Sequence, residues 1–115
     1  MDTRTKIVSA ATAAQLHHGT FVRGYFDPLT VAHVRQIEEL TGPVTILLDS
    51  PPRPLLPVAA RAELLAALTA VNQVVISEND VPPEFAAHQV MDERDGDLRR
   101  ARELMDHVMR RQNAG

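Results

Sequence analysis

Two side chains that could act on a phosphate, Thr30 and His33, lie three residues apart at the start of a segment with helical spacing. They follow an apolar run over 21–26 and an Asp-Pro pair. Backbone N–H groups in the first turn of a helix lack partners within the helix, and the helix dipole is positive there, so this place favours a phosphate group. Residues three apart share one helix face, and we therefore expect Thr30 and His33 to contact one ligand. The alternative is that His33 is a surface or capping residue.

The stretch from Gly24 to His33 resembles the (H/T)xGH motif of the small nucleotidyltransferases. These are the cytidylyl- and adenylyltransferases that join a nucleotide to a sugar phosphate, an alcohol phosphate or pantetheine phosphate. The resemblance is greatest to the nucleotidyltransferase domain of ADP-heptose synthase and to glycerol-3-phosphate cytidylyltransferase. It extends to Arg53-Pro54 and to the segments 61–68 and 71–76, and it weakens afterwards.

This resemblance implies that CTP or ATP gives its nucleotidyl group to a small phosphorylated acceptor, with release of pyrophosphate and with assistance from Mg2+. Thr30 and His33 would be the catalytic pair that donates hydrogen bonds to the triphosphate. No residue is assigned to a metal. The residues that the resemblance places at the nucleotide are Gly24, Tyr25, Phe26, Asp27, Arg53 and Arg61.

Three of these residues have a second interpretation. Asp27 and Pro28 suit the N-cap and the first position of the following helix, and we favour this structural role. Arg61 is equally well explained as a solubilising charge on the outer face of an alanine-rich helix. Arg53, in a loop beside prolines, is open between a phosphate clamp and an ordinary loop residue.

The sequence departs from the family pattern at three places. Ala32 stands where the motif has a glycine, and its methyl group would crowd a nucleotide that approaches the backbone closely. The loop before Arg53 lacks the family's phosphate-binding lysine, since the only lysine of the chain is Lys6. In the family, serine and threonine residues of one turn hold the γ-phosphate. The corresponding turn of this chain, residues 95–100, contains neither serine nor threonine.

The acidic residues around this turn match no calcium-loop spacing, so we expect a solvated linker; they are Asp92, Glu93, Asp95 and Asp97. Arginines near the turn could substitute as phosphate ligands, namely Arg99, Arg100 or Arg102. The departures leave open a second function, a catalytically degenerate member of the same fold that acts as a nucleotide-binding or protein-assembly module. A flavodoxin-like signalling domain is a third and weaker alternative.

The bulk properties suit one globular domain over 1–115. The chain has 115 residues, of which 44% are hydrophobic and 23% charged. Its formal net charge of −3 gives no reason to expect a nucleic-acid partner. The absence of cysteine excludes disulfides and thiolate chemistry. No run approaches the ~20 apolar residues of a membrane span, so we expect a cytoplasmic protein without a membrane partner.

Apolar periodicity predicts a small Rossmann-like three-layer α/β/α sandwich with a parallel sheet, whose ligand lies beyond the carboxyl ends of the strands. Ser9 is the expected N-cap of a short N-terminal helix. No fourth strand is evident, and the apolar stripe of the last helix is compatible with a homodimer. We expect an N-terminal helical region over 1–19, with its helix over 7–16. The core over 20–78 should contain strands over 21–26, 44–48 and 74–77 and helices over 31–40 and 57–70. A short helix over 84–90, a linker over 92–97 and a C-terminal helix over 98–112 should follow.

Overall fold

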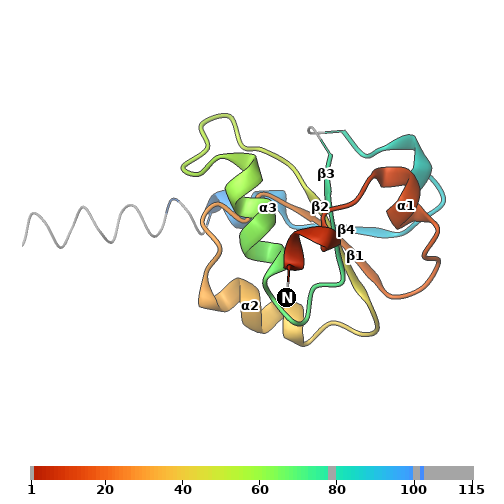
Figure 1. Ribbon diagram of the computed structural model, residues 1–115. Coiled ribbons are helices and arrows are strands. Elements are labelled where there is room, and N and C mark those ends of the chain that lie inside the picture. Colours follow the sequence, from red (N-terminus) through yellow and green to blue (C-terminus); the bar gives the residue numbers. More distant parts are fainter. Residues whose placement is uncertain (1, 78–79, 100–101, 103–115) are drawn as a thin grey trace, which may run out of the picture.

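A parallel sheet of four strands forms the centre of the computed structural model, which describes residues 2–77, 80–99 and 102 (Figure 1). Strand β1 lies between β2 and β4, because the order in the sheet is β3-β2-β1-β4. Gly24 of β1 is aligned with Leu48 of β2, so the carboxyl ends of these strands meet at one edge of the sheet. The strands are β1 (Thr20–Gly24), β2 (Val44–Leu48), β3 (Gln73–Ile76) and β4 (Val90–Asp92).

Helices cover both faces of the sheet. One face packs against α2 (Val31–Glu38) and α3 (Val58–Ala66), and the other packs against α1 (Ala10–Ala14) and the 3-10 helix η2 (Pro83–Phe85). A further 3-10 helix, η1 (Thr3–Lys6), precedes α1 and contacts α3. Figure 1 shows α2 and α3 on the side of the sheet away from α1.

Neighbouring residues of each strand enter different cores. In β1, Val22 packs with the residues of α2 and α3, whereas Phe21 packs with Ala13 of α1 and Phe85 of η2. In β3, Val74 and Val75 divide in the same way. A strand that is buried on both faces needs a continuous apolar run, which is the pattern that marks these strands in the sequence. The predicted three-layer α/β/α fold with a parallel sheet is confirmed.

Two local predictions, an N-cap and a strand, are also confirmed. Ser9 is the N-cap of α1 and accepts a hydrogen bond from the Thr12 N–H at 3.2 Å. The second strand has the predicted bounds, Val44–Leu48. Among the described residues, none of the helices combines the length and the apolar character that crossing a bilayer requires.

Three expectations after residue 80 are wrong. A fourth strand is present, since Val90–Asp92 pairs with β1; it is only three residues long and ends in an exposed Met-Asp pair, so it carries no strand pattern. The predicted helix over 84–90 is reduced to the 3-10 turn Pro83–Phe85. The predicted linker over 92–97 contains the end of β4 and the start of a helical segment over 94–99. Most of the predicted helix over 98–112 lies outside the described residues.

Candidate functional site

The candidate site lies where the chain leaves β1. From β1 the sheet continues to β2 and β3 on one side and to β4 on the other, and ligands of open α/β sheets bind outside the carboxyl ends of the strands at such a point. After Gly24 the backbone turns through Phe26, whose φ of 47° lies in the left-handed region that is uncommon for a bulky residue. This turn directs the backbone N–H groups of Tyr25 and Phe26 toward one atom of Asp97.

Thr30 and His33 form a capping box at the start of α2. The Thr30 hydroxyl accepts a hydrogen bond from the His33 N–H at 3.3 Å, and His33 Nδ1 accepts one from the Thr30 N–H at 3.1 Å. Thr30 is therefore the N-cap, and the expectation that Asp27 caps this helix is wrong. Because a backbone N–H can only donate, this contact assigns the ring proton of a neutral His33 to Nε2.

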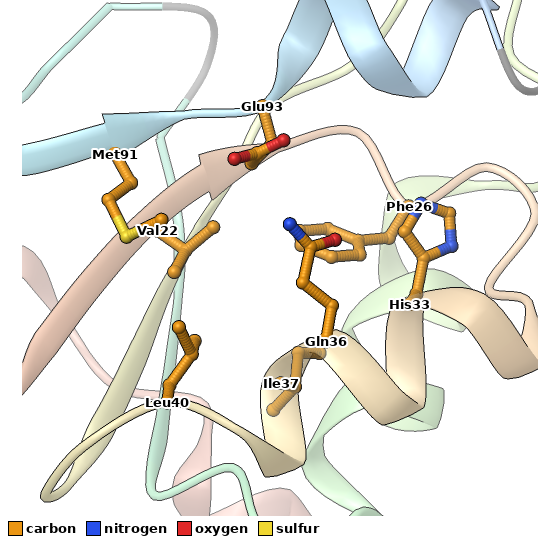
Figure 2. A pocket seen from close by; sticks show the side chains of 8 residues that line it. All are labelled: Val22, Phe26, His33, Gln36, Ile37, Leu40, Met91 and Glu93. Atoms are coloured by element: carbon orange, nitrogen blue, oxygen red, sulfur yellow. The ribbon is translucent and has the colours of Figure 1, made fainter.

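The imidazole of His33 is 3% exposed and faces Asp97 rather than solvent. Its Nε2 lies 2.7 Å from Asp97 Oδ1. Its ring centroid is 5.2 Å from that of Phe26. Figure 2 shows the two rings next to each other at one end of a small apolar pocket between α2 and strands β1 and β4, with Gln36 and Glu93 as the polar residues of its lining besides His33.

Asp97 is the residue on which these groups converge, and no sequence pattern singled it out. Its Oδ2 accepts hydrogen bonds from the Tyr25 N–H at 2.7 Å and from the Phe26 N–H at 3.2 Å. It is 4% exposed, so the expectation of a solvated linker is wrong for this residue. We use the term donor cluster for the Tyr25 N–H, the Phe26 N–H and the Nε2 of His33.

Gly24 provides the space in which the Asp97 carboxylate lies. A Cβ atom at this position would be 2.7 Å from Asp97 Oδ2 and 2.8 Å from a ring carbon of Phe26. Both separations are shorter than carbon makes with non-bonded neighbours, so a larger residue would displace the carboxylate or the ring. Gly24 thus permits an anion to approach the backbone of this turn.

Asp27 connects the turn after β1 to the loop before α3. Its carboxylate accepts hydrogen bonds from the N–H groups of Leu55 and Leu56, at 2.6 and 3.0 Å. Asp27 therefore has a structural role, as we favoured, but the element that it stabilises is this loop and not α2.

Arg61 is buried in the scaffold below the site. It is 1% exposed, and its guanidinium donates to the carbonyls of Leu56, Tyr25 and Asp49 at 3.1, 2.8 and 2.7 Å and to the Ser50 hydroxyl at 2.8 Å. Burial lowers the pKa of the guanidinium, and the charge of Asp27 opposes this shift. The alternative that Arg61 is a solubilising surface charge is wrong.

A second buried polar group lies beside Arg61. The carboxylate of Asp49 is fully buried and accepts hydrogen bonds from Arg23 Nε and from the Ser77 hydroxyl. Arg94 Nε lies 3.9 Å from the same carboxylate. Sequence reasoning missed these residues. Two signals could have drawn attention to them: Arg23 lies within an apolar strand, and Asp49 directly follows a second apolar strand.

An open pocket of about 520 Å³ borders Asp97. It brings together three of the predicted nucleotide-binding residues, Tyr25, Asp27 and Arg53. Arg102, one of the arginines suggested as a substitute phosphate ligand, also lines it. Arg100 is not among the described residues. The complete lining is Tyr25, Asp27, Pro51, Arg53, Leu55, Asp97, Leu98 and Arg102.

The fold and this pocket define a small Rossmann-like α/β protein with an open pocket at the carboxyl edge of its sheet. A search of curated proteins finds the bifunctional protein HldE of Syntrophotalea carbinolica, which is 34% identical to this chain over 77 residues. The match covers 56% of this chain and 16% of HldE, so the chain corresponds to a small part of that protein. No protein-family model matches the chain.

Proposed function

We propose that the protein is a nucleotidyltransferase that moves a nucleotidyl group from CTP or ATP to a small phosphorylated acceptor. The observation that carries this proposal is the convergence of the Tyr25 N–H, the Phe26 N–H and His33 Nε2 on one anionic position. These groups hold a carboxylate here, and the same donors suit a phosphate oxygen. The partial similarity to HldE supports a nucleotidyltransferase-type function at the level of the family.

The proposed reaction needs no nucleophile from the protein. A phosphate oxygen of the acceptor attacks the α-phosphorus of the nucleotide, a new P–O bond forms, and the bond to the bridging oxygen of the β-phosphate breaks. Pyrophosphate leaves with the bonding electron pair. The protein would contribute by orienting the triphosphate and by stabilising the charge that develops on the phosphoryl oxygens, to which the His33 Nε2–H and the two backbone N–H groups would donate.

Exposed arginines would bind the outer phosphates. Arg53 and Arg102 line the open pocket next to Asp97, whereas Arg61 donates to carbonyls and would act by positioning the loops. Within the described part of the chain, no group of three histidine, aspartate or glutamate side chains could hold a metal ion. A Mg2+ ion would accordingly take most of its ligands from the triphosphate and from water, as it commonly does.

A second candidate is the degenerate module, and one observation favours it. Asp97 occupies the position that a phosphate would need, and it belongs to the turn where the resemblance leads us to expect hydroxyl side chains. A protein in which this arrangement is permanent would keep the fold and lose the triphosphate. The two candidates therefore differ in whether the carboxylate can be displaced.

A nucleotide panel with Mg2+ tests the proposal. Specific binding of CTP or ATP to the folded protein must raise its melting temperature, and a catalytic protein must also release pyrophosphate when a suitable acceptor is added. The Arg53→Ala variant should weaken the nucleotide effect, whereas Arg35→Ala, which removes an exposed arginine of α2 outside the pocket lining, should not. No thermal shift with any nucleotide at millimolar concentration would support the degenerate module.

The His33→Ala variant is a less suitable test than the sequence alone suggests. A side chain that only contacts the triphosphate could be removed with a loss of pyrophosphate release and a nearly unchanged melting temperature. Because the ring is buried and takes part in the capping box, we now expect His33→Ala to lower the stability as well.

A further inference from the structure

We propose that Asp97 is an internal competitor of the ligand: its carboxylate occupies a phosphate position of the nucleotide site and must leave before a phosphorylated ligand can bind. This inference rests on the proposed nucleotide site and adds a regulation to it. The position is defined by the donor cluster, whose groups lie 2.7, 3.2 and 2.7 Å from the two oxygens of Asp97.

The donor cluster requires an anion. Two backbone N–H groups and an Nε2–H point to one buried place, and leaving such donors without an acceptor is costly. A buried carboxylate is likewise costly unless donors surround it. Asp97 satisfies both requirements in the absence of a ligand. Two oxygens of a phosphate group would serve as acceptors for the same donors.

The shape of the turn supports this reading. Gly24 leaves the space that the Asp97 oxygen fills, because a Cβ atom there would lie 2.7 Å from it. The left-handed φ of Phe26, 47°, directs two successive N–H groups to one side of the chain. Successive N–H groups arranged in this way form a concave site that binds anions. A glycine and an uncommon backbone angle thus occur together at the point where the carboxylate is held.

The carboxylate and a phosphate cannot share this position. Two anions held by the same donors would repel each other at short distance in a poorly solvated place. Asp97 also lines the open pocket, so its side chain borders the space into which it could be displaced, and Arg53 and Arg102 line the same pocket. The protein would therefore have a closed state, with Asp97 in the donor cluster, and an open state that binds the ligand.

Competition of this kind lowers the apparent affinity by the fraction of molecules in the open state. Substituting Asp97 with a neutral side chain should consequently strengthen the binding of phosphorylated ligands. A residue that only supported the fold would have the opposite effect or none, because its loss cannot improve binding. The sign of the change separates the two roles.

The experiment measures the affinity of inorganic pyrophosphate, CTP and ATP, each with Mg2+, by calorimetry on the wild-type protein, Asp97→Asn and Asp97→Ser. Asp97→Asn keeps the shape of the side chain and removes its charge. Asp95→Asn is the matched control, because it makes the same charge change at an exposed position two residues away. We expect both Asp97 variants to bind pyrophosphate at least about tenfold more tightly than the wild-type protein, and the Asp95 variant to bind like the wild-type protein.

Each outcome is decisive. Unchanged or weaker pyrophosphate binding in a folded Asp97 variant overturns the inference, as does an equal gain in Asp95→Asn. If neither Asp97 variant folds, the wild-type protein decides: millimolar pyrophosphate must move the Cγ resonance of Asp97 in a carbon-detected NMR spectrum, and an unmoved resonance overturns the inference.

The same measurements distinguish the inference from the proposed function. Asp97 variants that gain affinity for pyrophosphate but bind neither CTP nor ATP would support the internal competitor and contradict the nucleotidyltransferase. A wild-type protein that binds nucleotide as tightly as the Asp97 variants do would leave the proposed function standing and end the proposal for Asp97.

Discussion

Two buried charges, those of Arg61 and Asp97, lie near the carboxyl edge of the sheet and are surrounded in different ways. The Arg61 guanidinium is enclosed by acceptors, which are the Tyr25 carbonyl after β1 and, in the single loop between β2 and α3, the carbonyls of Asp49 and Leu56 and the Ser50 hydroxyl. The Asp97 carboxylate is enclosed by donors, of which two belong to a single turn and the third to the helix that follows it. Arg61 and its acceptors are called the Arg61 network below.

The difference decides which of the two charges a ligand can replace. The carbonyls that accept from Arg61 belong to the turn after β1 and to the loop between β2 and α3, so the guanidinium holds these two segments together and has to remain. The donor cluster needs an anion but does not require that the anion come from the chain. Charge burial thus builds a scaffold in the first case and a replaceable contact in the second.

The largest effect is expected from breaking the Arg61 network. Arg61→Met keeps much of the apolar stem and removes the guanidinium that donates to three buried or part-buried carbonyls, so we expect a loss of about 3 kcal/mol in the free energy of unfolding. Urea denaturation followed by circular dichroism measures it. Arg53→Met, at an exposed position, should change the stability by less than about 0.5 kcal/mol. Equal effects of the two substitutions would contradict the scaffold role.

An intermediate effect is expected at Thr30, which fixes the ring of His33 within the donor cluster. Thr30→Ala removes the N-cap of α2 and should cost about 1 kcal/mol of stability, while Thr30→Ser keeps the hydroxyl and should cost only a small part of this. Thermal denaturation compares the two variants. The His33 imidazole should keep its proton on Nε2 in Thr30→Ala, because the backbone N–H that donates to Nδ1 remains, and nitrogen-detected NMR of the ring can observe this. An unchanged stability in Thr30→Ala would show that the capping box contributes little.

The smallest effect concerns the ion pair between Asp92 and Arg94. The side-chain hydrogen bond from Arg94 is the main cause that lowers the pKa of Asp92 from 3.8 to about 2. A lowered carboxylate pKa stabilises the folded state above pH 4 or so, and this contribution is lost as the pH falls from about 4 to about 2. The two side chains are 47% and 30% exposed, so water screens the pair and the contribution should stay well under ~1 kcal/mol.

Unfolding free energies of the wild-type protein and Asp92→Asn should therefore differ slightly near pH 6 and converge near pH 2. A difference that persists at pH 2 would mean that Asp92 acts through something other than its charge. A large difference near pH 6 would place this exposed pair among the scaffold contacts.

The sequence predicted the layers of the fold and half of the site. Continuous apolar runs, such as Val44–Leu48, mark strands buried on both faces, and the spacing of Thr30 and His33 placed them at one helix start. Asp97 could not be found in this way, because its contact with His33 spans 64 residues of chain and β4, the strand that precedes it, is too short to show a pattern. The burial of the Arg61 side chain could not be predicted either, because the sequence pattern did not distinguish an arginine that points into the protein from one on the helix surface.

The most direct test of the central claim is an NMR titration of the 15N-labelled wild-type protein with CTP or ATP in the presence of Mg2+. We predict that the amide resonances of Tyr25 and Phe26 shift progressively and saturate, as the ligand replaces Asp97 as their acceptor. The amide of Asn72, which donates to Val44 O at the opposite edge of the sheet, should stay in place. Saturable binding that leaves the Tyr25 and Phe26 amides unmoved, or a spectrum that millimolar nucleotide does not change, would contradict the claim that phosphate binds where β1 passes into α2.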